Sequence, residues 1–446
     1  MAIFNRDSDD EVTRGTRAVV VHAETHGADR RDSEARLEEA RGLALAIGID
    51  VRAAQAFRVR DRKPATLFGS GQVDSIAALA QAEEAELVIV DNALSPVQQS
   101  NLEKACQVKV IDRTGLILEI FGERAATNEG RLQVELAHLD YQAGRLVRSW
   151  THLERQRGGF GFLGGPGETQ IEADRRMIRD RMAKIRRELD QVTRTRGLHR
   201  ARRQRAPWPV IALVGYTNAG KSTLFNRLTG AEVMAEDLLF ATLDPTMRQI
   251  SLPGLDKAIL SDTVGFVSDL PTQLIAAFRA TLEEVLSADL IVHVRDIAHP
   301  DSEAQRDDVM DVLEELGVAG EAAYARDGEA SDPPPIIEAW NKLDLLGQDE
   351  AERLHELAAR RDDVVILSAL TGEGADRLQR TISGHLTAGA QIQTLRVPMA
   401  DGAALAWLHE HGEVVGSREE GHDSVLEVRL SDSALARFRK REQAES

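Results

Sequence analysis

The nonapeptide GYTNAGKST, residues 215–223, carries two glycines, a lysine and hydroxyl residues at the spacing GxxxxGK[ST]. The two glycines let backbone N–H groups turn toward phosphate oxygens. Lys221 is placed to reach terminal phosphates, and the Ser222 hydroxyl is a suitable ligand for Mg2+. Because the motif lies between an apolar run at 209–214 and a helical pattern, we predict a phosphate-binding loop rather than a plain turn.

Two short motifs further along the chain predict which base is held. NKLD, residues 341–344, ends a predicted strand, which is where ligands bind in open α/β sheets. The Asp344 carboxylate can accept hydrogen bonds from N1–H and the amino group of guanine, which adenine cannot offer. SAL, residues 368–370, follows the next strand and supplies a backbone N–H for the base oxygen. This order of motifs predicts a GTPase.

The motif DTVG, residues 262–265, is predicted to contact the terminal phosphate and its metal ion. Asp262 would contact Mg2+ through water, and the N–H of Gly265 would lie near the γ-phosphate. Phe266 follows, where Ras-like GTPases carry a water-orienting glutamine. Since phenylalanine cannot polarise water, we interpret Phe266 as a packed switch residue and assign catalysis to Lys221, Mg2+, backbone dipoles and a partner.

A second switch is predicted at FATLDPT, residues 240–246, which resembles the corresponding segment of related GTPases. Thr242 is the expected Mg2+ ligand there, with Thr246 as the alternative. Asn218 occupies the place where potassium-stimulated GTPases hold an asparagine, so K+ is a second candidate cofactor, and this question stays open. The predicted catalytic residues are Lys221, Gly265 and Asn218, and the predicted metal ligands are Ser222, Thr242 and Asp262. The predicted nucleotide-binding residues are Gly215, Tyr216, Thr217, Asn218, Ala219, Gly220, Lys221, Ser222, Thr223, Phe240, Ala241, Thr242, Asp262, Gly265, Asn341, Lys342, Asp344, Ser368, Ala369 and Leu370.

The motifs lie among alternating strand and helix patterns, which we expect to position them. Between residues 210 and 390 the alternation predicts a doubly wound, mostly parallel sheet of a P-loop GTPase. Buried strands at 18–22, 86–91 and 108–112, with helical patterns between them, predict a smaller α/β unit before it. The fold class is therefore α/β, with predicted domains at 1–125 (α/β subdomain), 126–206 (helical hairpin), 207–390 (GTP-binding domain) and 391–446 (small α/β domain).

The predicted hairpin carries most of the positive charge. Residues 171–206 hold 13 basic and 5 acidic residues, a net charge of +8 in a chain whose formal net charge is −18. Such a cluster favours contact with a polyanion, because phosphates release counterions when cations replace them. The glycine-rich tip at 157–168 is open to two interpretations, a flexible linker or a loop that enters a narrow site.

The composition indicates a globular protein without a membrane span. The chain has 446 residues, of which 42% are hydrophobic and 29% charged, as in globular proteins, and no apolar run is long enough to span a membrane. The first residues lack the pattern of a secretory signal, so we expect a cytoplasmic protein. Cys106, the single cysteine, is expected to be a buried inert thiol. The polar segment 317–335 is predicted to be a surface insertion.

Together with these motifs, GGFGFLGGPGETQIEADRR, residues 158–176, resembles the HflX family of ribosome-associated GTPases over nearly the whole chain. The resemblance implies a partly ribosome-associated protein that binds GTP and GDP, and the large ribosomal subunit with its rRNA. In its GTP-bound state it would split stalled or idle ribosomes, and we expect a monomer when free. Two alternatives stay open: a GTPase of subunit assembly, and an ATP-dependent RNA remodeller acting through the amino-terminal module. The expected ribosome contacts are Arg155, Arg157, Gly158, Phe160, Phe162, Arg175, Arg176, Arg179, Arg186 and Arg187.

Overall fold

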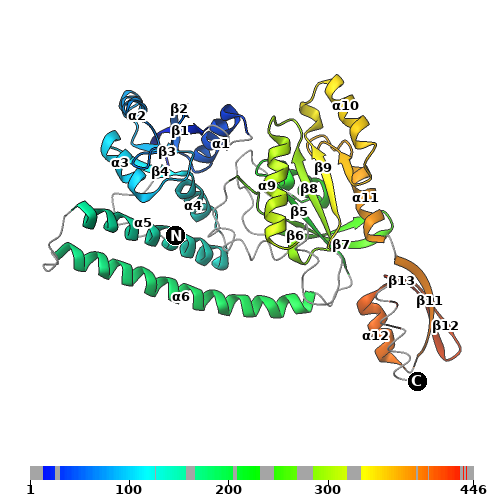
Figure 1. Cartoon of the computed structure of the whole chain (residues 1–446). Coiled ribbons are helices and arrows are strands. Elements are labelled where there is room, and N and C mark those ends of the chain that lie inside the picture. The colour runs from blue at the N-terminus through cyan, green and yellow to red at the C-terminus, as the bar shows by residue number, and fades with distance from the viewer. Residues whose placement is uncertain are drawn as a thin grey trace.

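The strands of the computed structural model form sheets of four, six and three strands in the part of the chain that it describes. The described residues are 14–25, 31–125, 127–156, 166–203, 208–231, 246–268, 285–318, 333–387, 390–399, 401–431, 435 and 438. Figure 1 shows two α/β regions with a pair of long helices below the first, and a small sheet near the carboxyl terminus. The predicted α/β class is confirmed, while the exact domain boundaries stay a prediction.

The N-terminal α/β region is a parallel sheet in the order β2-β1-β3-β4. Its central strands β1 and β3 are mostly buried and carry the apolar runs 18–21 and 87–90, which suits burial on both faces. In chain order the elements are β1 (Arg17–Thr25), α1 (Ser33–Ala46), β2 (Asp50–Val59), α2 (Ser70–Ala82), β3 (Leu87–Val90), α3 (Pro96–Cys106), β4 (Lys109–Asp112) and α4 (Arg113–Arg124). The order reverses at β1, so β1 and β3 lie at the point where open α/β sheets have a crevice.

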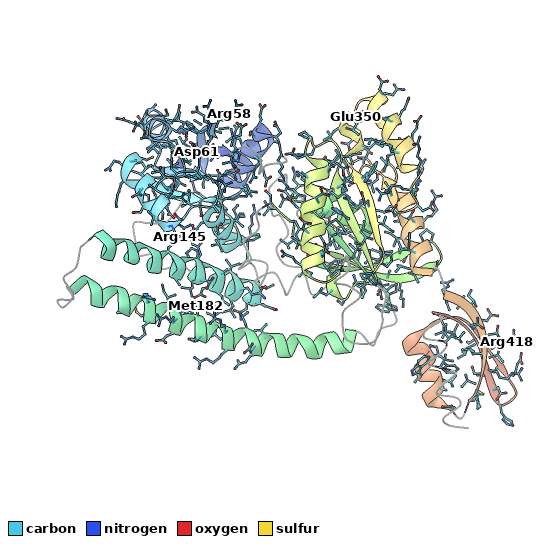
Figure 2. All side chains as sticks on the ribbon, in the orientation of Figure 1. Arg58, Asp61, Arg145, Met182, Glu350 and Arg418 are labelled. Carbon is cyan, nitrogen blue, oxygen red and sulfur yellow. The ribbon has the colours of Figure 1, made fainter. Side chains whose placement is uncertain are left out.

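The next two helices, α5 (Asn128–Gln156) and α6 (Pro166–Arg203), run side by side (Figure 1). Arg181 of α6 makes a two-point bond to Glu135 of α5, with N–O distances of 2.6 and 2.8 Å. Met182, labelled in Figure 2, and Ile185 are buried on the same helix. An apolar seam and a bidentate ion pair therefore fix α6 against α5.

The central α/β region has the strand order β10-β9-β8-β5-β7-β6, in which the pairs are parallel except β6 with β7. This is the doubly wound, mostly parallel sheet that the alternation of strand and helix patterns predicts. Its elements are β5 (Val210–Gly215), α7 (Lys221–Thr229), β6 (Thr246–Leu252), β7 (Leu255–Asp262), β8 (Leu290–Asp296), α9 (Ser302–Glu315), β9 (Ile336–Asn341), η2 (Leu343–Leu345), α10 (Gln348–Ala358), β10 (Val364–Ile366) and α11 (Ala375–Thr387).

The C-terminal sheet is antiparallel in the order β11-β13-β12. It comprises β11 (Ala390–Pro398), β12 (Glu413–Glu420) and β13 (Asp423–Ser431), with α12 (Gly402–His411) preceding β12. A small core around Leu408, Val428 and Phe438 holds α12 on the sheet. Arg429 also donates to the carbonyl of Gly254 in the β6–β7 turn, which connects this sheet to the central region.

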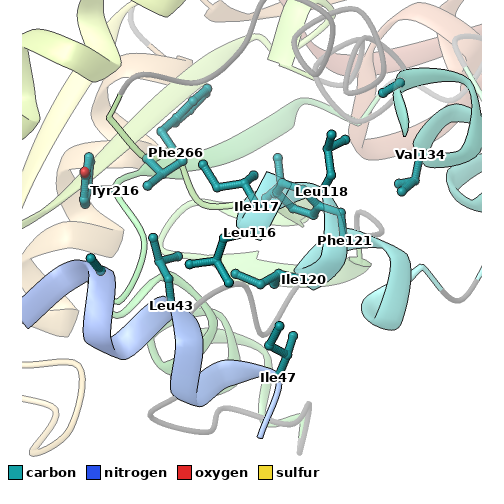
Figure 3. Packing of buried hydrophobic residues seen from close by; sticks show 14 of the residues in the cluster. Leu43, Ile47, Leu116, Ile117, Leu118, Ile120, Phe121, Val134, Tyr216 and Phe266 are labelled. Carbon is teal, nitrogen blue, oxygen red and sulfur yellow. The ribbon is translucent and has the colours of Figure 1, made fainter. Parts of the chain in front are cut away.

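One hydrophobic core extends across the N-terminal and central regions (Figure 3). Leu43 of α1 and Leu116 of α4 belong to the same buried cluster as Tyr216 and Phe266 of the central region. Each of these four side chains is at most 3% exposed. The two regions are therefore packed together at the phosphate-binding loop. Among the described residues, no helix is long and apolar enough to cross a membrane.

Candidate nucleotide-binding site

The predicted phosphate loop joins the end of β5 to the start of α7. Gly215 has φ 152°, and a Cβ there would lie 2.2 Å from the Val294 carbonyl oxygen. Gly220 has φ 93°, and its Cβ would lie 2.2 Å from Nδ2 of Asn341. The backbone φ angle and the lack of room for a Cβ atom therefore both require glycine at positions 215 and 220, the two glycines of the sequence motif.

Lys221 is buried directly behind this loop, with 6% of its surface exposed. Its Nζ donates to the carbonyl oxygens of Gly215, at 3.1 Å, and Tyr216, at 2.8 Å. Burial lowers the pKa of Lys221 to about 8, and the nearby Asp262 carboxylate only partly opposes this. A phosphate beside Nζ would stabilise the charged form, so Lys221 is suited to bind an anion.

Two predicted magnesium ligands lie in direct contact. The Ser222 hydroxyl donates to Oδ2 of Asp262 at 2.7 Å, and Asp262 is fully buried. A hydroxyl and a carboxylate beside a phosphate loop form the hard-oxygen donor set that Mg2+ prefers. Thr246, the alternative switch ligand, pairs with Asp262 across β6 and β7. The preferred ligand Thr242, with Phe240 and Ala241, lies outside the described residues.

Asn341 connects the NKLD motif to two other predicted parts of the site. Its Nδ2 donates to the Ala219 carbonyl at 2.8 Å, and its Oδ1 accepts the N–H of Ala369 at 2.8 Å. Asn341 is 2% exposed, so it is a buried crosslink between the phosphate loop and the SAL motif. The three motifs, far apart in sequence, are thus brought to one edge of the sheet.

The carboxylate predicted to select guanine is exposed and held in place. Asp344 accepts a hydrogen bond from the Ser368 hydroxyl, and Ser368 is fully buried. Lys342 is anchored by an ion pair to Asp296 at 2.7 Å. Leu370 is 69% exposed beside them. An oriented, accessible carboxylate is what recognition of two adjacent N–H groups requires.

DTVG continues from β7 and runs against the phosphate loop. The N–H of Phe266 donates to the Gly215 carbonyl at 3.1 Å, and Phe266 in turn accepts the N–H of Thr217 at 2.7 Å. Phe266 is 3% exposed, as expected for a packed switch residue. Asn218, by contrast, is exposed and has φ 58°. The remaining loop residues Tyr216, Thr217 and Ala219 are buried, and Thr223 is half-buried.

The predicted RNA-contact arginines on α6 do not belong to its buried seam. Arg176, Arg179, Arg186 and Arg187 are exposed, and Arg175 is half-buried. In the described part of the chain no carboxylate pairs with these five, in contrast to Arg181. The side chain of Arg155, and Arg157, Gly158, Phe160 and Phe162 of the glycine-rich tip, lie outside what is described.

Sequence reasoning missed the contacts that the N-terminal region makes with this site. The Tyr216 hydroxyl donates to both carboxylate oxygens of Glu39 at 3.0 Å, and Arg113 donates to Ser268. No motif signals these pairs, because their partners are distant in the chain.

Comparisons with known proteins now define the family. Four family models match: GTP-binding GTPase N-terminal at 34–122, GTP-binding GTPase Middle Region at 124–203, 50S ribosome-binding GTPase at 210–323, and HflX C-terminal domain at 353–443. The GTPase HflX of Magnetococcus marinus is 47% identical over 422 residues, 95% of this chain and 94% of that protein. The chain belongs to the HflX family of GTPases. The GTPase HflX of Escherichia coli is 41% identical over 437 residues, 98% of each chain.

Membership of the HflX family confirms the predicted GTPase activity and the predicted binding of GTP and GDP. Among solved structures, a GTP-binding protein from Sulfolobus solfataricus in complex with GDP is 23% identical, with a TM-score of 0.43. The match covers 83% of this chain and 99% of that chain.

Proposed function

We propose that this HflX-family GTPase binds the large ribosomal subunit and, with GTP bound, splits stalled or idle ribosomes into subunits. Hydrolysis of GTP then resets the protein. The observation that carries the proposal is the exposed set of arginines on α6, a helix fixed to α5 and so to the N-terminal region. The family description of residues 210–323 as a 50S ribosome-binding GTPase supports the same partner.

In this proposal the nucleotide lies along the edge where β5, β7, β9 and β10 end. The loop 215–220 surrounds the phosphates, Lys221 binds their terminal oxygens, and Asp344 with the backbone of residues 368–370 selects guanine. Ser222, Thr242 and water on Asp262 hold Mg2+, which neutralises charge on the phosphates when bound. We propose that Asn218 helps to seat K+, since the hydrophobic Phe266 replaces a water-orienting glutamine.

The RNA contacts proposed here combine the α6 arginines with the tip of the hairpin. Guanidinium groups bind phosphates through paired N–H donors, so exposed arginines suit the rRNA backbone. Aromatic side chains in a glycine-rich loop suit stacking on unpaired bases. The proposed contacts are Arg175, Arg176, Arg179, Arg186 and Arg187 on α6, Arg155 near the end of α5, and Arg157, Gly158, Phe160 and Phe162 at the tip.

Ribosome splitting is tested by light scattering of intact ribosomes mixed with the protein and GTP, GDP or a non-hydrolysable GTP analogue. Scattering should fall with GTP or its analogue and stay constant with GDP. Deletion of residues 158–167 should abolish the fall and preserve binding of free GTP. If this deletion variant splits ribosomes as well as the parent protein does, the tip is only a linker. Tighter binding to immature particles than to mature subunits would favour an assembly function, and ATP binding by residues 1–200 would favour the remodeller.

The α6 contacts predict a particular dependence on salt. Each phosphate neutralised contributes roughly 0.7 to 0.9 to the slope of log affinity against log salt. Substitution of Arg186 and Arg187 by glutamine should therefore flatten the slope for 50S binding by about 1.5. The matched control replaces by glutamine Arg353, which is exposed on α10, and Arg360, which is exposed just after that helix, and it should keep the parent slope. Equal slopes in the two double variants would reject α6 as the RNA surface.

A further inference from the structure

The last turn of α7 carries Arg227, which binds the loop that follows β10. Its Nε donates to the carbonyl oxygen of Ala369 at 3.2 Å, and its Nη2 donates to the carbonyl oxygen of Leu370. A guanidinium suits this task because its N–H donors form a rigid planar fork that can bind two acceptors at once. Since α7 begins at the phosphate loop, Arg227 joins the far end of that helix to the SAL motif.

The Arg227 guanidinium also lies against Gly372 of the same loop. A Cβ on Gly372 would be 3.1 Å from Nη1 and 3.3 Å from Cζ of Arg227, and φ at Gly372 is 94°. The loop is closed by the N–H of Gly372, which donates to the Ser368 carbonyl at 2.8 Å. Glycine at position 372 therefore both permits the turn and leaves room for the guanidinium. Two carbonyl oxygens and this glycine hold the Arg227 head on the loop, although Arg227 is an exposed residue.

The two carbonyl bonds determine which way the neighbouring N–H groups face. In a planar trans peptide the C=O and the following N–H point in opposite directions, and no peptide bond among the described residues is cis. Because the Ala369 carbonyl faces Arg227, the N–H of Leu370 faces away from it. The same argument turns the N–H of Thr371 away from Arg227, and that group donates to Oγ of Ser368 at 3.1 Å.

The side that these N–H groups face is the side of the carboxylate predicted to select guanine. The Ser368 hydroxyl, which accepts one of them, donates in turn to Asp344. The N–H of Ala369 is taken by Oδ1 of Asn341 at 2.8 Å, whereas that of Leu370 has no acceptor in the part of the chain that the structure describes. A donor without a protein partner on this side is suited to the O6 acceptor of guanine, which adjoins the N1–H that the carboxylate would bind.

We propose that Arg227 is a positioning residue for guanine recognition. By holding the carbonyl oxygens of Ala369 and Leu370, it aims the N–H of Leu370 at O6 of the base. A donor that is oriented before the nucleotide arrives binds without the entropy cost of ordering its loop, so Arg227 raises the affinity for bases that carry O6. The inference rests on the proposed position of guanine between Asp344 and residues 368–370, and it concerns neither ribosome binding nor splitting.

The test measures dissociation constants of the full chain for three diphosphates, by competition with fluorescent GDP and without ribosomes. GDP and IDP carry O6, whereas the diphosphate of 2-aminopurine riboside lacks it. Arg227→Gln should weaken GDP and IDP by about threefold to tenfold, the loss of one hydrogen bond, and should change the affinity for the 2-aminopurine nucleotide by less than about twofold. Damage to α7 or to the phosphate loop would weaken all three nucleotides equally, and that result, or an unchanged affinity for GDP, overturns the proposal.

Arg380→Gln is the matched control. Arg380 is an exposed arginine of α11, and its Nε donates to the Asp376 carbonyl of its own helix at 3.2 Å. This variant should leave all three dissociation constants unchanged. Asp344→Asn separates the inference from the base site on which it rests. If Asp344→Asn keeps the parent preference for GTP over XTP, guanine binds elsewhere and both assignments fail. If that preference shifts while Arg227→Gln leaves GDP binding unchanged, only the role of Arg227 is rejected.

Discussion

The lowered pKa of Lys221 predicts that nucleotide affinity depends on pH. Burial brings this pKa to about 8, so the free protein holds mainly neutral lysine above that pH. A phosphate binds the ammonium form, so nucleotide binding must then take up a proton. Because the pKa is low in the free protein and raised in the complex, affinity is fully present below pH 8 and is lost above it. The dissociation constant for GDP should rise about tenfold per pH unit beyond roughly pH 8.5.

The assay titrates fluorescent GDP between about pH 6.5 and pH 9, where the lysine changes charge. Calorimetry in two buffers of different ionisation heat should show proton uptake approaching one per nucleotide at the alkaline end. Lys221→Arg is the control, since arginine keeps its charge throughout and the variant's weaker binding should vary little with pH. The control also subtracts any titration of guanine itself. A flat profile for the parent protein, or one parallel to that of Lys221→Arg, would refute the reasoning.

Three further predictions test the site and its support. Asp344→Asn should weaken GTP binding by about tenfold to a hundredfold, because a hydrogen bond to a charged acceptor is lost. The same variant should favour xanthine nucleotides. An unchanged preference for GTP over XTP in titrations rejects the assignment of Asp344 to base selection. Hydrolysis should be faster in potassium than in sodium, and Asn218→Ala should remove the difference; equal initial rates of the parent in both salts reject the cation site. Phe266→Ala should lower the free energy of unfolding by about 3 to 5 kcal/mol in urea titrations, and a loss below about 1 kcal/mol would place Phe266 outside the shared core.

The sequence predicts the buried strands well, including the edge strand β4 at 108–112, and predicts the more exposed edge strands poorly. The apolar run at 209–214 matches β5, and the predicted strand at 86–91 matches β3, because both strands are buried on two faces. By contrast β2, β6 and β12 were not predicted. Each lies at the edge of its sheet, where exposed positions take polar side chains and the apolar signal weakens.

A similar limit applies to the site. The motifs around Lys221, Asp262 and Asp344 are local in sequence, and the parallel sheet brings their ends to one edge, so their meeting could be predicted. The contact of Tyr216 with Glu39 spans 177 residues, and that of Arg113 with Ser268 spans 155. Such pairs depend on how two sheets dock, which no periodicity or spacing encodes.

The core shared by Leu43, Leu116 and Phe266 has a consequence during synthesis of the chain. The N-terminal α/β region leaves the ribosome complete at Arg124, but its apolar partner at Phe266 follows about 140 residues later, roughly 7 to 30 seconds at ordinary elongation rates. For that interval the face formed by α1 and α4 is exposed to water, and the nascent chain is vulnerable to aggregation or to capture by chaperones. A protein proposed to act on stalled ribosomes would thus itself suffer if its own translation paused between these two points.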